Sequence, residues 1–110
     1  MTKYVDIPVP FEWNSGDCKP VLATRLSVEE LSARNRLELF RAEDDLDWFV
    51  GAHCMNASFG PLLIMRHDHN PERLTAFYVD RGLDSGSAQA VIARLFSLCE
   101  PEIAWASCVP

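Results

Sequence analysis

The chain has 110 residues, of which 48% are hydrophobic and 24% charged, a composition typical of globular proteins. This length is enough for one domain with a single core and too short for two, so we expect one domain over residues 1–110. Sixteen Asp and Glu residues outnumber ten Lys and Arg residues, which gives a formal net charge of −6. Such an acidic chain disfavours nucleic acid and anionic membrane surfaces as partners, and it favours a basic protein.

The sequence predicts no membrane-spanning segment and no export signal. No apolar run approaches the roughly 20 residues that span a bilayer. The N-terminal sequence MTKYVDIPVP lacks the basic and then apolar pattern of a signal peptide. We therefore expect a cytoplasmic protein, and we expect its four cysteines to be free thiols because none forms a C-x-x-C pair.

Residues 1–20 are expected to form an irregular, extended segment packed on the rest of the domain. Pro8, Pro10 and Pro20 each lack the backbone N–H that a sheet ladder needs. Asn14-Ser15-Gly16-Asp17 is typical of a turn.

A short helix is predicted to begin after Ser27 and to run to about Asn35. The spacing of Ser27 and Glu30 is that of a capping box, in which each side chain accepts from the other residue's backbone N–H. Beyond it, residues 36–42 alternate as a strand does.

The stretch 60–80, GPLLIMRHDHNPERLTAFYVD, predicts a β-hairpin at the centre of the sheet. Both apolar arms, near 62–67 and 73–80, are apolar on both sides, which is typical of strands covered on both faces. Residues 46–55 predict a further strand, so the three would form an antiparallel meander. Gly51 within that strand indicates a bulge or close packing.

A second helix is predicted from Asp84-Ser85-Gly86-Ser87 to a stop at Pro101, followed by a strand over 103–106. One helical face carries an apolar stripe of Ala88, Val91, Ile92, Leu95, Phe96 and Cys99. The whole predicts an α+β fold: an antiparallel sheet of about four or five strands, with the C-terminal amphipathic helix on one face and a shorter N-terminal helix.

His67-x-His69 is a spacing that some metal sites use, and His53 and Cys54 on a neighbouring strand would be needed to complete such a site. Cys54 paired with His67 would be a nucleophile and base if the strand register brought them together. The simpler interpretation is a solvated turn, a buried Cys54 and Cys99, and no metal or cofactor. Trp13, Trp48 and Trp105 are expected in the core.

An acidic loop, Glu43-Asp44-Asp45-Leu46-Asp47, is the clearest candidate for binding a basic protein. With this loop, the turn His67–Glu72 and the terminal Ile103-Ala104-Trp105, the chain resembles small bacterial immunity proteins that neutralise toxins, including those of contact-dependent growth inhibition. The resemblance covers the stretch from about Leu37 to Ala106. It implies a non-catalytic protein that covers the active site of a basic toxin. The residues expected to contact that partner are Glu43, Asp44, Asp45 and Asp47.

Two alternatives stay open. One is a small metal protein or enzyme that uses His67 and His69 with His53 and Cys54. The other is a structural subunit that pairs through an open sheet edge, with an oligomeric state that the sequence leaves undetermined.

Overall fold

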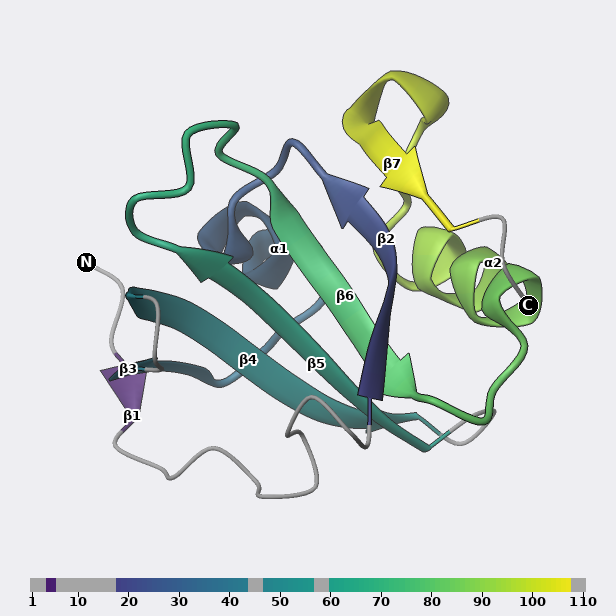
Figure 1. Ribbon diagram of the computed structural model, residues 1–110, viewed down its shortest axis with the longest axis horizontal. Helices are drawn as coiled ribbons and strands as arrows, with labels where there is room; N and C mark the ends of the chain where they lie inside the picture. The colour runs from purple at the N-terminus through teal and green to yellow at the C-terminus, as the bar shows by residue number, and fades with distance from the viewer. Residues whose placement is uncertain (1–3, 6–17, 44–46, 57–59, 108–110) are drawn as a thin grey trace.

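The structure is a computed structural model, and it describes residues 4–5, 18–43, 47–56 and 60–107 (Figure 1). The side chains of residues 4–5 and 53–56 are not described. The chain forms its elements in the order β1 (Tyr4–Val5), β2 (Cys18–Thr24), α1 (Val28–Arg34), β3 (Leu39–Glu43), β4 (Trp48–Asn56), β5 (Gly60–His67), β6 (Thr75–Asp80), α2 (Ser85–Leu95), the 3-10 turn η2 (Glu100–Glu102) and β7 (Ile103–Ala106).

The strands form one mixed sheet in the order β1-β3-β4-β5-β6-β2-β7. All neighbouring pairs are antiparallel except β1 and β3, which are parallel. The α+β class and the antiparallel meander β4-β5-β6 are confirmed. The expected count of four or five strands is wrong, because the described residues include seven.

The predicted hairpin of β5 and β6 lies in the interior of the sheet, and β5 is the fourth of the seven strands. Its side chains enter two cores, as expected from arms that are apolar on both sides. Leu62 and Ile64 belong to a large cluster on one face, whereas Leu63 belongs to a smaller cluster with Phe40 and Phe49.

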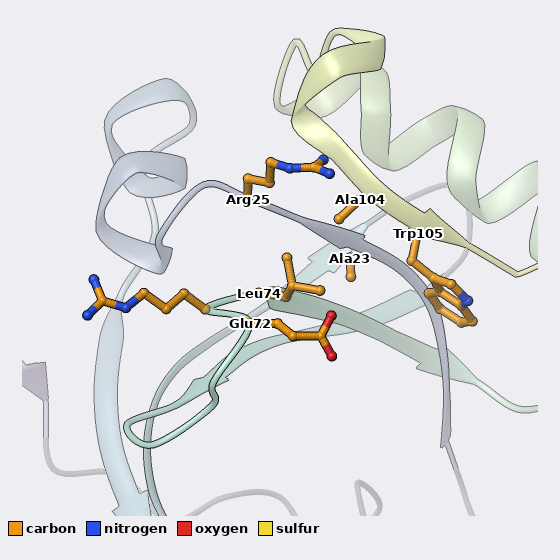
Figure 2. Close-up of a pocket in the computed structure, with 7 residues that line it drawn as sticks. Ala23, Arg25, Glu72, Leu74, Ala104 and Trp105 are labelled. Carbon is orange, nitrogen blue, oxygen red and sulfur yellow. The ribbon is translucent and has the colours of Figure 1, made fainter.

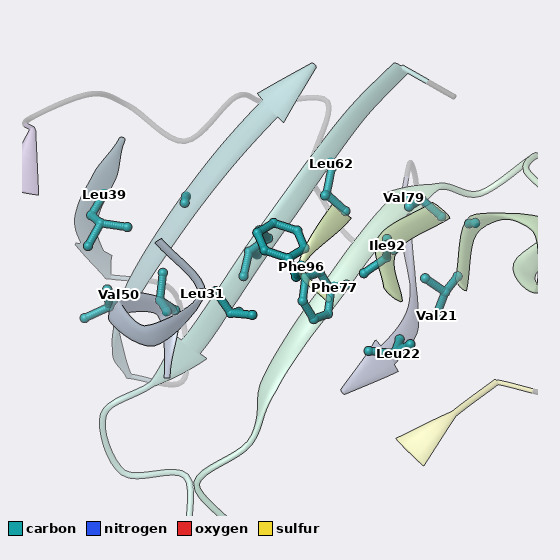
Figure 3. Close-up of a cluster of buried hydrophobic side chains, with 14 residues drawn as sticks. Val21, Leu22, Leu31, Leu39, Val50, Leu62, Phe77, Val79, Ile92 and Phe96 are labelled. Atoms are coloured by element: carbon teal, nitrogen blue, oxygen red, sulfur yellow. The ribbon is translucent and has the colours of Figure 1, made fainter. Parts of the chain in front are cut away.

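Both helices pack on the face that holds the larger cluster (Figure 3). Leu31 of α1 and Ile92 of α2 are fully buried there, together with Phe77 of β6. This cluster holds most of the buried hydrophobic side chains of the described residues, and each Å² of apolar surface buried contributes about 25 cal/mol to stability.

The sequence does not predict strand β2, because Pro20 lacks the backbone N–H that a sheet ladder needs. The structure tolerates Pro20 because the pairing of β7 with β2 reaches only to Leu22, so that β6 is the one strand paired with β2 at Pro20 among the described residues. The register also shifts between Pro20 and Leu22. The expected turn at 14–17 and most of the expected extended segment lie outside the described residues.

The capping box that begins α1 is confirmed. The Ser27 hydroxyl accepts from the Glu30 N–H at 3.0 Å, and the Glu30 carboxylate accepts from the Ser27 N–H at 2.9 Å. Gly51 makes a close approach and no bulge: a Cβ there would lie 2.8 Å from Cζ of Phe40.

Helix α2 ends earlier than predicted, at Leu95 instead of near Pro101. Ser97 has a positive φ of 51°, and the Leu98 N–H donates to the carbonyl of Ala93, which closes the helix as a Schellman motif does. Cys99 therefore lies beyond the helix and is exposed, so its expected place in the buried stripe is wrong. The stop was missed because serine rather than glycine occupies the left-handed position.

Candidate functional site

One end of the sheet carries an aromatic side chain among carboxylates. Trp48, the first residue of β4, pairs across the ladder with Glu43 of β3. On its other side, the Asp68 N–H donates to the Trp48 carbonyl at 2.9 Å. Paired residues on antiparallel strands share a face, so Trp48 and Glu43 lie next to each other. We call Glu43, Asp47, Trp48 and Asp68 the acidic end.

The expectation that the tryptophans are core residues is wrong for two of them. Trp48 is 48% exposed and Trp105 is 46% exposed, and they are the exposed large hydrophobic side chains among the described residues. Trp13 lies outside those residues. Tryptophan is one of the side chains that most often dominates the binding energy of protein interfaces. A pattern of apolar strand residues could not reveal this, because Trp48 stands at the very start of its strand.

A contact between Asp47 and His69 joins the two loops at this end of the sheet. The His69 backbone N–H donates to Oδ2 of Asp47 at 2.7 Å, and Nδ1 of His69 lies 2.9 Å from Oδ1 of Asp47. The side-chain hydrogen bond and the negative charge of Asp47 raise the pKa of His69 above 6.5. The same hydrogen bond lowers the pKa of Asp47, so this carboxylate stays ionised.

A hollow of about 370 Å³ opens beside this contact. Two of the side chains that line it, Asp47 and Glu72, are carboxylates, and the rest of its wall is formed by His67, His69, Asn70 and Pro71. We call it the acidic hollow. Carboxylates in the wall of a small hollow suit the ammonium or guanidinium group of a Lys or Arg side chain.

The predicted acidic residues are placed in part. Glu43 is the exposed last residue of β3, and Asp47 is partly buried by its contact with His69. Asp44 and Asp45 lie outside the described residues. Asp68, which the prediction of contact residues left out, lies on the same end and forms an ion pair with Arg41.

The histidines and the cysteine considered for metal binding or catalysis are not brought together. His53 pairs with Leu63 and Cys54 with Leu62, whereas His67 pairs with Phe49 near the other end of the same ladder. Four or five residues of strand separate them from His67, which is roughly 13–17 Å.

His67 also packs its ring on Phe49, with ring centroids 5.6 Å apart. Within the described parts of the chain, no three His, Cys, Asp or Glu side chains are grouped as a metal site needs.

A larger hollow, of about 690 Å³, lies near the β7 edge of the sheet, between β2, β7 and the loop before β6 (Figure 2). Glu72 lines both this hollow and the acidic hollow. Trp105 and Leu74 give it an apolar part, and Arg25, Glu72 and Arg73 give it charged groups of both signs. Because positive and negative side chains line the hollow together, its charge does not favour one class of ligand.

Comparison with protein-family models, with curated proteins and with solved structures found no match to this chain. In the ranges that the structure describes, no helix has the length and apolar character to cross a membrane.

Proposed function

We propose that this protein is a non-catalytic binding protein whose acidic end binds a basic protein, as an immunity protein binds a toxin. The observation that carries the proposal is Trp48, a half-exposed aromatic side chain set between Glu43 and Asp68. The expected compartment is the cytoplasm, where such a partner would be neutralised.

The acidic end combines the two kinds of group that such an interface uses. An aromatic anchor supplies affinity through the surface that it buries, and carboxylates around it accelerate association with a basic partner. The acidic hollow next to it has the charge to receive a Lys or Arg side chain of that partner. The net charge of −6 extends the attraction beyond the contact itself.

In this mechanism the protein inhibits its partner by covering the partner's active site. The partner's basic active site is closed by the acidic end, and Trp48 excludes water from the centre of the contact. The Asp47–His69 contact holds the two loops in place before binding, which reduces the entropy lost on association.

The test is a titration of the purified protein against the C-terminal domain that the neighbouring upstream gene encodes, at low and at high salt. We expect a one-to-one complex that forms faster at low salt. Glu43→Lys is expected to weaken binding about tenfold, mostly through slower association. Glu100→Lys changes an exposed carboxylate in η2 and is expected to bind as the wild type does. Equal binding by both variants, or no complex at either salt, would contradict the proposal.

A structural subunit is a second candidate, favoured by strand β7. This strand is at the edge of the sheet, its sequence IAWA has no charge, and Trp105 in it is 46% exposed. An uncharged edge strand is open to pairing with another copy of the chain. If this holds, sedimentation will give the mass of a dimer, and Trp105→Lys will give that of a monomer.

A further inference from the structure

Arg66 of β5 is a partly buried guanidinium held by neutral groups. Its Nε donates to Oγ1 of the fully buried Thr75 at 2.9 Å, and its Nη2 donates to the carbonyls of Arg25 and Leu26 at 3.0 Å each. No carboxylate among the described residues forms an ion pair with it. The position of the guanidinium is therefore fixed by neutral groups, while the nearest acidic side chains, Glu29 and Glu30, act on its charge only from a distance. Holding a charge in this way is costly for a group partly withdrawn from water.

A hollow of about 350 Å³ lies next to Arg66, between the start of α1, the strands β3 to β5 and the loop before β6. Three arginines line it: Arg41, Arg66 and Arg73. The cross-strand register places Arg41 and Arg66 on either side of Val50, so these two share one face of the sheet. We call it the arginine hollow.

The charges around the arginine hollow leave an excess of positive charge in a chain of net charge −6. Arg41 forms an ion pair with Asp68, and Glu29 of α1 is the other carboxylate that lines the hollow. Arg73 is exposed, and no ion pair to it occurs among the described residues. Burial lowers the pKa of Arg66, Glu30 and Glu29 raise it, and the neighbouring charge of Arg73 lowers it.

Hydrogen-bond donors are also left over on this wall. Nη1 of Arg66 makes no hydrogen bond with the described residues. Asn70 uses its Oδ1 to accept from the N–H groups of Glu72 and Arg73, at 2.9 and 3.1 Å, so its Nδ2 stays available as a donor. Guanidinium and amide donors around a small hollow match the acceptors of a phosphate or carboxylate group.

We propose that the arginine hollow is a binding site for a small oxyanion, a phosphate or carboxylate group, with Arg66 and Arg73 as its charged ligands and Asn70 as a further donor. The bound anion supplies the direct ion pair that Arg66 does not form with any described residue. The volume of the hollow suits a small molecule rather than a chain of residues. This site does not depend on the protein partner proposed above, since a free anion reaches it in the isolated protein.

The test is a titration of the isolated protein with inorganic phosphate, and separately with succinate, followed by NMR at constant ionic strength. The two titrations distinguish phosphate from carboxylate as the preferred group. We expect saturable binding at millimolar concentrations, with shifts at Arg66, Asn70 and Arg73.

The variant Arg73→Asn removes one charge and keeps the fold, because asparagine tolerates the positive φ of 54° at this position. We expect it to weaken anion binding about tenfold, as expected for the loss of a charged hydrogen-bond donor. Arg94→Asn removes an exposed arginine of α2 and is expected to bind as the wild type does. No saturable binding of either anion, or equal loss in both variants, would overturn the proposal, since equal loss indicates general charge attraction.

Discussion

At the scale of single residues, Asp47 has two roles: it belongs to the acidic end, and it holds His69. The sequence pointed to Asp47 as one acidic residue of a loop, but it did not indicate that His69, 22 positions along the chain, would be its partner. That pairing depends on the register of β4 and β5, in which Phe49 lies opposite His67.

We predict that Asp47→Asn lowers the pKa of His69 toward 6.5. Asp47 raises this pKa by its side-chain hydrogen bond and by its charge, and the amide removes the charge. An NMR titration of the His69 ring measures the change. An unaltered titration would contradict the contact described here.

Gly51 is a second residue of note, because its neighbours leave no room for a side chain. We predict that Gly51→Ala destabilises the protein by about 1–3 kcal/mol, the usual cost of overpacking a core. The new Cβ would lie 2.8 Å from Cζ of the fully buried Phe40 and 3.2 Å from the carbonyl oxygen of Ile64, which the backbone holds in place. Urea unfolding measures the loss.

Gly86→Ala is the matched control for this substitution. A Cβ at Gly86, in the first turn of α2, would lie 3.5 Å from Oδ2 of Asp84, an ordinary contact. We expect it to leave stability unchanged or raise it by up to about 1 kcal/mol, since alanine favours helix more than glycine does. A loss of stability equal to that of Gly51→Ala would contradict the packing described for β4.

At the scale of elements, Arg34 and Glu102 connect α1 with the C-terminal part of the chain. The two side chains form a bidentate ion pair, in which Nη1 and Nη2 of Arg34 lie 2.8 and 2.6 Å from Oε1 and Oε2 of Glu102. Nη1 of Arg34 also donates to the carbonyls of Phe96 and Ser97. Arg34 therefore satisfies carbonyls at the end of α2, where a positive charge also suits the helix dipole.

This connection predicts a dependence of stability on pH. The hydrogen bond that Glu102 accepts from Arg34 lowers the pKa of Glu102 from 4.5 to about 2 in the folded protein. A lowered pKa means that the stabilisation is fully present above pH 4.5 and is lost as the pH falls toward 2. The wild type is thus expected to be more stable than Glu102→Gln at pH 7, and this difference is expected to shrink between pH 4.5 and 2.

Urea unfolding at several pH values measures this difference. The control is Glu100→Gln, which changes an exposed carboxylate with no ion pair to another described residue. Its difference from the wild type is expected to change far less over the same range. A difference between wild type and Glu102→Gln that is constant with pH would contradict the role given to this ion pair.

The elements that the sequence predicted are those whose signals are local. The capping box at Ser27 and the apolar arms of the hairpin each depend on residues a few positions apart, and the structure confirms both. Strand β2 was missed because the structure accommodates Pro20 through a distant feature. The pairing of β7, about 80 positions further along the chain, stops before it reaches Pro20. The early end of α2 was missed because Ser97 adopts a positive φ that its sequence does not signal.

At the scale of the whole molecule, the sequence predicted the acidic residues of the candidate site but not the exposure of Trp48 beside them. The acidic loop is plain in the sequence. In the structure Glu43 is exposed and Asp47 is partly exposed. Exposure of Trp48 follows from its place at the end of the sheet, which is a property of the assembled strands. The same assembly keeps His53 and Cys54 away from His67, which the sequence left open.

The most direct test compares two tryptophans of nearly equal exposure, Trp48 at 48% and Trp105 at 46%. The affinity of Trp48→Ala and of Trp105→Ala is measured against the proposed partner, the C-terminal domain that the neighbouring upstream gene encodes. We predict that Trp48→Ala raises the Kd about 30-fold or more, as the loss of an interface hot spot does, and that Trp105→Ala leaves it unchanged. Wild-type affinity in Trp48→Ala, or an equal loss in Trp105→Ala, would contradict the assignment of the acidic end as the binding surface.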